Sequence, residues 1–117
     1  MQMTQIASAS LSLHVVPDRA EVAVVLAGEL DLHSAHALET QVAELRDAGF
    51  DRIVVDLSDV CLIDSSGLRV LITLRNAARR RRHGLELVPA PADTQRVFDL
   101  TATRALFDWR APRRAAS

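Results

Sequence analysis

The sequence predicts an α/β fold: a small domain with a mixed four- to five-stranded sheet, βαβ crossovers and about three to four helices. Apolar, β-branched runs of strand length alternate with segments in which apolar residues recur every three or four positions. All four glycines fall at junctions between such segments. The resulting order is β-β-α-β-α-β-α. Right-handed crossovers then make the second, third and fourth strands parallel, with the first strand antiparallel to the second.

The first two predicted strands form a hairpin. The run from 11 to 16 alternates and then becomes apolar, and the run from 21 to 28 is almost wholly apolar. Residues 17–20, Pro-Asp-Arg-Ala, are typical of the turn between them. We expect residues 28–31 to lead the chain out of the sheet.

The first helix follows, with Ser34 as its predicted N-cap. Its core face is predicted from the spacing of Leu38, Val42 and Leu45. Gly49 stands where the end of a helix needs a positive φ.

The second half of the chain repeats the strand and helix pattern. A third strand is predicted over 53–57 and a fourth over 85–89. Between them a long helix runs from about 66 to 82, with Gly84 closing it. A short third helix is expected near Val97 and Phe98, with Asp93 as its cap, and a last apolar patch comes from Leu106, Phe107 and Trp109.

Length and composition predict one domain over residues 1–117, with its core at about 11–109 and a frayed tail at 110–117. The net charge of −1 gives no general attraction to nucleic acid or to anionic membranes. No apolar run is long enough to cross a membrane, and the first twelve residues lack the features of a signal peptide. We therefore expect a cytoplasmic protein, monomeric when free, with Cys61 as a buried, inert thiol.

The chemistry of the chain is concentrated at Asp64-Ser65-Ser66-Gly67, between the third strand and the long helix. Two hydroxyls and a carboxylate there lie where the first turn of a helix leaves backbone N–H groups unpaired. Those groups and the helix dipole favour a negative charge. The motif predicts a phosphate-accepting switch rather than a catalytic centre. The simpler alternative is that Ser65 only caps the helix.

The long helix carries a polar stripe formed by Arg69, Thr73, Asn76 and Arg80. Val70 and Leu74 make its apolar arc broader than one buried face needs. Either the helix packs on both flanks, or its exposed edge meets a partner. The run Arg79–Arg82 is interpreted as a solvated helix end, where cations offset the dipole.

Other chemistries are poorly supported. His33 and His36 have no nearby Cys or carboxylate to complete a metal site, so no metal and no cofactor are expected. Ser65 lies in no Gly-x-Ser-x-Gly motif, and the chain has no lysine for a phosphate-binding loop. The sequence therefore predicts a binding protein, not an enzyme.

Residues 64–68, following an apolar strand, resemble the STAS domain of anti-sigma factor antagonists. The upstream segment 26–31 and the downstream segment 96–101 fit the same pattern, and the resemblance extends over about 11–109. It implies that an anti-sigma factor that is a serine kinase phosphorylates Ser65, or less favourably Ser66. The unphosphorylated antagonist would bind that kinase and release sigma, and a PP2C-type phosphatase would reset the switch.

We also predict supporting roles in the switch or in partner binding for residues around that serine, from the resemblance for Asp31 and Asp64 and from the polar stripe of the long helix for Thr73. These are Asp31, Asp64, Ser66, Gly67, Arg69 and Thr73. Asp31 has two interpretations, a loop carboxylate that caps the first helix or a part of the kinase-docking surface. Arg69 stands where many members have glycine, and Ala102 replaces a usual glycine.

Two rival functions remain open. The first is a STAS subunit of a larger assembly, either a stressosome or a lipid-transport ABC complex. The second is a nucleotide-binding or nucleotide-hydrolysing protein.

Overall fold

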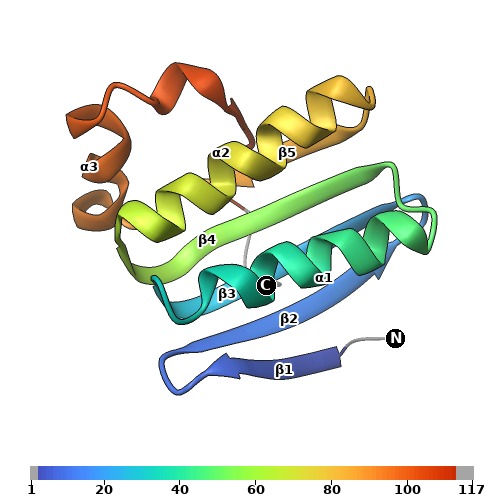
Figure 1. Cartoon of the computed structure of the whole chain (residues 1–117), viewed down its shortest axis with the longest axis horizontal. Helices are drawn as coiled ribbons and strands as arrows, with labels where there is room; N and C mark the ends of the chain where they lie inside the picture. The colour runs from blue at the N-terminus through green and yellow to red at the C-terminus, as the bar shows by residue number, and fades with distance from the viewer. Residues whose placement is uncertain (1–2, 113–117) are drawn as a thin grey trace.

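The computed structural model describes residues 3–112, with side chains from residue 9 onward. Its strands form one sheet in the order β1-β2-β3-β4-β5-β6, and α1 and α2 lie side by side across one face of it (Figure 1). In chain order the elements are β1 (Met3–Ser8), β2 (Leu11–Asp18), β3 (Glu21–Leu30), α1 (Ala35–Asp47), β4 (Arg52–Ile63), α2 (Ser65–Arg80), β5 (Gly84–Val88), α3 (Ala92–Leu100), a 3₁₀ turn (Arg104–Leu106) and β6 (Asp108–Trp109). The predicted α/β class is confirmed.

The strand directions are those that the crossovers predict. β2 is antiparallel to β3, whereas β3, β4 and β5 are mutually parallel. The sheet gains two edge strands that the sequence analysis did not predict. β1 pairs with β2 in the antiparallel sense, and the two-residue β6 pairs in parallel with β5.

β3 and β4 are both longer than predicted. The segment from Gly28 to Leu30 was expected to leave the sheet, but Gly28 pairs with Val60 and Leu30 with Ile63. Register shifts after Val25 and after Gly28 let the two strands bend together and continue. As a result β3 and β4 end side by side, which places the loop after β3 next to the first turn of α2.

Three predicted helix ends differ in detail. Ser34 is in the N-cap position of α1, but its side chain donates to the Glu29 carbonyl at 2.9 Å instead of capping the helix. Asp93 is in the first turn of α3 without a cap hydrogen bond. Gly49 has φ +100° as predicted, whereas after α2 the residue with positive φ is Arg82, at 57°, and not Gly84.

The main core lies between the sheet and the helices. Alternate β3 residues Val22, Val24 and Leu26 face it, together with Leu38 and Val42 of α1. Most of the apolar arc of α2 is buried, namely Leu68, Val70, Leu71 and Leu74, whereas Ile72 is half-buried. Burial of Val70 and Leu74 agrees with packing on both flanks of α2, and a partner contact at the exposed edge stays a prediction.

Aromatic packing anchors the end of the chain to this core. The Phe98 ring of α3 is fully buried and makes edge-to-face contacts with Phe107, at 5.6 Å between centroids, and with Trp109, at 5.0 Å. Phe107 and Trp109 of the predicted apolar patch therefore pack against the core, whereas Leu106 of that patch is exposed.

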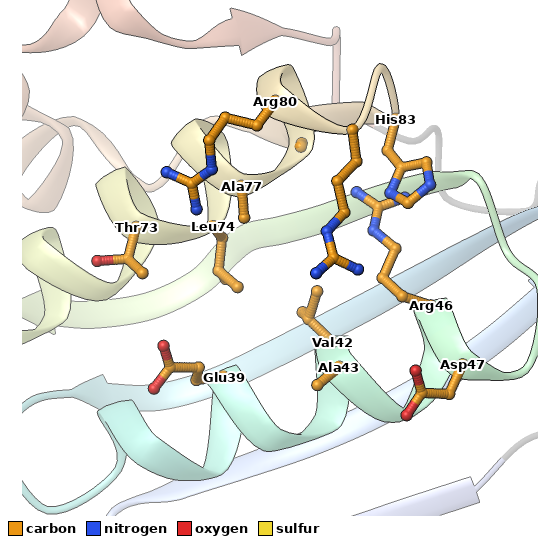
Figure 2. A pocket seen from close by; sticks show the side chains of 12 residues that line it. Glu39, Val42, Ala43, Arg46, Asp47, Thr73, Leu74, Ala77, Arg80 and His83 are labelled. Atoms are coloured by element: carbon orange, nitrogen blue, oxygen red, sulfur yellow. The ribbon is translucent and has the colours of Figure 1, made fainter.

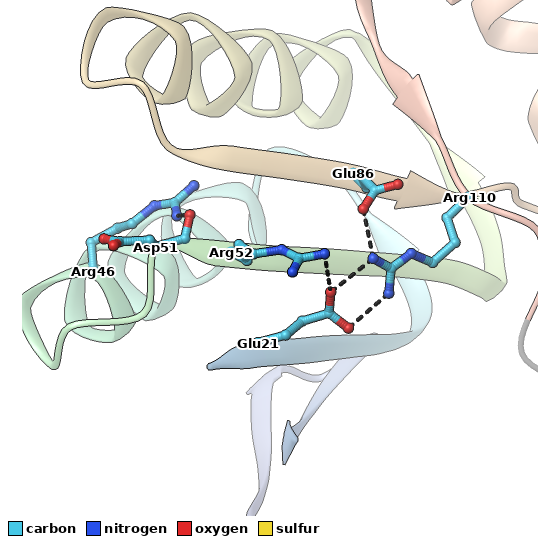
Figure 3. Close-up of polar contacts among 6 residues, drawn as sticks. All are labelled: Glu21, Arg46, Asp51, Arg52, Glu86 and Arg110. Atoms are coloured by element: carbon cyan, nitrogen blue, oxygen red, sulfur yellow. Dashed lines mark hydrogen bonds and ion pairs between the residues drawn. The ribbon is translucent and has the colours of Figure 1, made fainter. Parts of the chain in front are cut away.

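The opposite face of the sheet carries an ion-pair cluster around Arg110 (Figure 3). The Arg110 guanidinium donates two hydrogen bonds to Glu21, at 2.7 and 2.8 Å, and one to Glu86, at 2.6 Å. These bonds raise the pKa of Arg110 above its usual value. The prediction of a frayed tail from residue 110 is therefore wrong at Arg110, and residues 113–117 lie outside the described part of the chain.

Arg46, at the C-terminal end of α1, also joins separate elements through hydrogen bonds. Its guanidinium donates to the carbonyls of Phe50, Asp51 and Gly84 at 3.2, 2.7 and 3.1 Å. Burial lowers the pKa of Arg46, and the nearby Asp51 carboxylate partly offsets that shift. Arg46 thus ties the end of α1 to the first residue of β5.

Candidate functional site

Ser65 is the first residue of α2, and its side chain is exposed. Asp64, the residue before it, is the N-cap: its Oδ1 accepts a hydrogen bond from the backbone N–H of Gly67 at 2.9 Å. Within residues 3–112, no hydrogen bond engages the Ser65 hydroxyl. Asp64, and not Ser65, therefore caps α2, and the Ser65 side chain is open to solvent.

Asp64 also reaches the loop after β3. Its Oδ2 accepts from the backbone N–H of Leu32 at 3.2 Å, and its own N–H donates to the Leu30 carbonyl at 3.2 Å. The structure therefore brings the Asp31 loop against the start of α2, although the two segments are 32 residues apart in the chain.

Asp31 organises the turn that leads into α1. Its Oδ1 accepts from the backbone N–H groups of His33, at 2.9 Å, and Ser34, at 3.2 Å. Both N–H groups come before Ala35, the first residue of α1, so Asp31 holds the turn before the helix and does not cap the helix itself. The second interpretation, contact with a partner, stays a prediction.

A glycine is required at position 67 because the backbone of α2 lies against the backbone of β3 at Leu30. It is buried in the first turn of α2, and a Cβ at this position would overlap the backbone carbonyl oxygen of Leu30. A side chain here would push α2 away from the end of β3, so Gly67 sets the position of the serines relative to the Asp31 loop.

Two shallow hollows flank the first turns of α2. One, between α1 and α2, is lined by Leu32, Ala35, His36, Glu39, Ser66, Arg69, Val70 and Thr73. The other, between α2 and α3, is lined by Ser65, Leu68, Arg69, Ile72, Thr73, Val97 and Thr101. Arg69 and Thr73 line both hollows, so they form the exposed ridge between them. Ser66 is half-buried.

Three exposed leucines lie in or next to these hollows, and the sequence analysis did not single them out. Leu32 is 69% exposed, Leu62 43% and Leu100 78%. Leu62 and Leu100 line one further hollow, which shares Val97 with the hollow that contains Ser65. We call the surface formed by Leu32, Leu62, Ser65, Arg69, Thr73 and Leu100 the Ser65 face. Clustered exposed apolar side chains are typical of interaction sites.

Cys61 borders the same surface. It was expected to be buried, but its side chain is exposed, and Sγ lies 3.4 Å from the Gly28 carbonyl oxygen. The expectation is wrong because β4 continues through Cys61. The alternation of a strand then directs Val60 into the core and Cys61 away from it.

Another hollow lies between the far halves of α1 and α2, and has a volume of about 340 Å³ (Figure 2). Val42, Leu74 and Ala77 are among its apolar lining residues, and Thr73 is the predicted site residue that reaches it. Arg80 also lines it, and all four residues of the run Arg79–Arg82 are exposed at the end of α2, where the sequence places a solvated helix end.

Among the described residues there is no candidate cluster of metal ligands and no candidate membrane-spanning helix. His33 and His36 are exposed, and residues 3–112 contain no group of three or more side chains placed to hold a metal ion. Over the same residues, no helix combines the length and the apolar character that crossing a membrane requires.

The fold and this surface define a small α/β domain with an exposed serine at the start of a helix. Comparison with known families agrees: a family model described as "Mlab, STAS domain" matches residues 13–107. The chain belongs to the STAS-domain family.

Similar proteins carry antagonist names. The chain is 27% identical over 99 residues to the anti-sigma-B factor antagonist of Bacillus subtilis, covering 85% of this chain and 90% of that protein. A solved anti-sigma factor antagonist from Mycobacterium paratuberculosis superposes with a TM-score of 0.72 and 25% identity over 89% of both chains. The Bacillus protein SpoIIAA in its phosphorylated form shares the fold, with a TM-score of 0.63 and 15% identity over 97% of this chain and 92% of that one.

Proposed function

We propose that this protein is an anti-sigma factor antagonist whose unphosphorylated form binds a serine-kinase anti-sigma factor. Phosphorylation of Ser65 by that kinase ends the interaction, and a PP2C-type phosphatase restores it. The observation that carries the proposal is the Ser65 hydroxyl, which is exposed, free of capping and set among the leucines of the Ser65 face.

The exposed leucines of the Ser65 face provide the contact area for the partner, and phosphorylation of the Ser65 hydroxyl regulates that contact. Leu32 and Leu100, exposed at 69% and 78%, offer apolar area that a partner can cover. A phosphate on Ser65 would bring about −1.5 to −2 charges into the middle of that contact. Binding would then have to desolvate a dianion next to the Asp64 carboxylate, which is unfavourable.

The size of the effect is sufficient for a switch. At an effective dielectric constant of about 20, charges about 5 Å apart interact by about 3 kcal/mol. Since about 1.4 kcal/mol corresponds to a tenfold change in affinity, a loss of about 100-fold or more is expected. The fold itself tolerates the charge, because the start of α2 favours anions.

The test compares three full-length variants for binding to a purified anti-sigma factor kinase. Ser65→Asp is expected to abolish binding, whereas Ser65→Ala binds but accepts no phosphate. Ser66→Ala is the matched control and keeps both properties. Far-UV circular dichroism and melting temperature should stay close to wild type in all three. Normal binding of Ser65→Asp would refute the charge argument, and undiminished phosphorylation of Ser65→Ala would move the acceptor elsewhere.

The second candidate is a STAS subunit of a larger assembly, in which the same face makes a permanent contact. The exposed leucines favour it, because permanent interfaces are more apolar than transient ones. Pull-down from cells separates the two candidates. A kinase-like anti-sigma factor supports the switch, and an ABC-transporter ATPase or stressosome proteins support the assembly.

A further inference from the structure

We propose that Arg69 is the intramolecular counter-ion of phosphorylated Ser65, and that phosphorylation therefore withdraws this guanidinium from the docking surface. The inference rests on the proposed function, because it takes Ser65 as the phosphate acceptor. It adds a second part to the switch: the modification removes a cation from the face as well as adding an anion.

The spacing of the two residues on α2 brings their side chains together. Ser65 and Arg69 are four positions apart, and their Cβ atoms are about 6 Å apart in a regular helix. Helical Cα–Cβ bonds tilt toward the N-terminus, so the Arg69 side chain leans over the turn that contains Ser65. Acid before base at this spacing is also the more favourable order.

The surroundings leave room for the pair. Both side chains are exposed, and both line the hollow between α2 and α3, which has a volume of about 450 Å³. Val97 and Thr101 form the α3 side of that hollow, so no charged side chain of α3 lines it. A phosphate on Ser65 and the Arg69 guanidinium can therefore meet above the ridge without displacing packed groups.

Arg69 is available for this contact. In the described part of the chain its guanidinium makes no hydrogen bond or ion pair. Other arginines are held: Arg75 donates from Nε to the Leu106 carbonyl at 2.9 Å, and Arg104 pairs with Asp99 at 2.8 Å. Arg69 thus loses no existing interaction when it turns toward a phosphate.

The start of α2 offers a phosphate on Ser65 few free donors, so a side-chain cation is needed to compensate its charge. The neighbouring Asp64 is itself acidic, and it already takes the N–H of Gly67, one of the few donors that the start of α2 offers. Asp64 also takes the N–H of Leu32 from the adjoining loop. With these two donors occupied by a carboxylate, the charge of Arg69 is the closest compensation on the same helix.

Recruitment of Arg69 changes the docking surface. In the unphosphorylated protein Arg69 stands on the ridge between two hollows and can pair with a carboxylate of the partner. After phosphorylation the guanidinium is engaged within the chain. The partner then meets a phosphate and loses a cation at the same place.

The experiment uses the full chain with phosphoserine incorporated at position 65 during synthesis, and ³¹P NMR follows the second ionisation of the phosphate. Substituting Arg69→Gln is expected to raise the phosphate pKa by about half a unit, because an exposed ion pair at about 5 Å stabilises the dianion by that much. Arg69→Lys should restore most of the wild-type value. The Nε–H signal of Arg69 should also shift on phosphorylation.

Arg80→Gln is the matched control. Arg80 is exposed on the same polar stripe, so its loss changes the net charge equally, but it lies about 22 Å along the helix from Ser65, beyond the screening length. Equal phosphate pKa values in wild type and Arg69→Gln, or an unmoved Arg69 signal, would overturn the counter-ion role. Because the phosphoserine is installed without a kinase, a kinase that ignores Ser65 would sink only the proposed function.

Discussion

Asp64 and Leu32 are joined by a hydrogen bond of 3.2 Å from the Leu32 backbone N–H to the carboxylate Oδ2. The other oxygen of the same carboxylate caps α2 through Gly67 at 2.9 Å. One side chain therefore starts the helix that carries Ser65 and fixes the loop that presents the exposed Leu32. The hydroxyl and the leucine keep their relative position because both depend on Asp64.

The first prediction concerns this carboxylate. Asp64→Ala removes the cap of α2 and the anchor of the Leu32 loop together, which should lower the free energy of unfolding by about 2 kcal/mol. Urea denaturation at neutral pH measures the loss. Asp59→Ala is the control, since Asp59 is an exposed carboxylate of β4 and its removal should be nearly neutral. Equal stability of the two variants would show that the bridge contributes nothing.

The second prediction concerns Gly67. Replacing a helical glycine by alanine normally stabilises by about 1 kcal/mol. Here the added Cβ would overlap the Leu30 carbonyl oxygen, which is backbone and cannot swing aside. We expect a net destabilisation of about 2 kcal/mol, with displacement of α2 visible in amide chemical shifts around Leu30.

Gly84→Ala is the matched control for Gly67→Ala. At Gly84 the new Cβ would meet the flexible Arg52 side chain at 3.5 Å, an ordinary contact. Its melting temperature should stay within a few degrees of wild type. If Gly67→Ala behaves like Gly84→Ala, the close approach of α2 to β3 is not what demands a glycine.

The local sequence was sufficient for four of the six strands, for the three helices and for the directions of the strands it predicted. Hydrophobic periodicity identified β2, β3, the first half of β4, β5 and all three helices, and the crossover rule supplied the parallel pairing. It also placed Ser65 and the motif around it at a helix start. These features depend on residues close together in the chain, where spacing alone carries the information.

Several of the misses share a different cause, because they depend on contacts between residues that are distant in sequence. β4 continues to Ile63 because β3 lies beside it, and this turns Cys61 outward. Arg110 is held by Glu21, 89 residues earlier in the chain. The exposed leucines of the Ser65 face come from three separate elements. No window along the chain shows that they converge.

The third prediction concerns Arg110, which bridges β3 and β5 through Glu21 and Glu86 (Figure 3). Arg110→Gln leaves two carboxylates close together without their shared cation. Since all three side chains are partly exposed, at 23–35%, solvent screening limits the loss to about 1 kcal/mol. Thermal unfolding measures the loss, which should shrink in about 1 M salt, where the Debye length is about 3 Å.

The raised pKa of Arg110 sets the pH dependence of this contribution. A base whose pKa is raised on folding contributes stability that is fully present below its unfolded pKa and is lost only as pH rises through the folded value. For an arginine both values lie far above neutrality, so ionisation of the guanidinium adds no pH dependence near neutral pH. A wild-type advantage that fades between neutral and mildly alkaline pH would contradict this assignment.

The fourth prediction concerns Thr73, which is exposed on the ridge of the Ser65 face and lines both hollows beside it. Thr73→Arg places a long cation where a partner would pack, so the anti-sigma factor should bind at least about tenfold more weakly, a change of about 1.4 kcal/mol. The fold should be unaffected, because arginine is a better helix former than threonine. Titration calorimetry and thermal unfolding separate the two effects.

Thr40→Arg makes the same chemical change on α1, where Thr40 is exposed and lines neither hollow beside the ridge. It should leave the dissociation constant unchanged. The contrast matters because both variants add one positive charge, so a general electrostatic effect would weaken binding in both. An unaltered affinity of Thr73→Arg would remove the α2 ridge from the docking surface and leave binding to the exposed leucines around it.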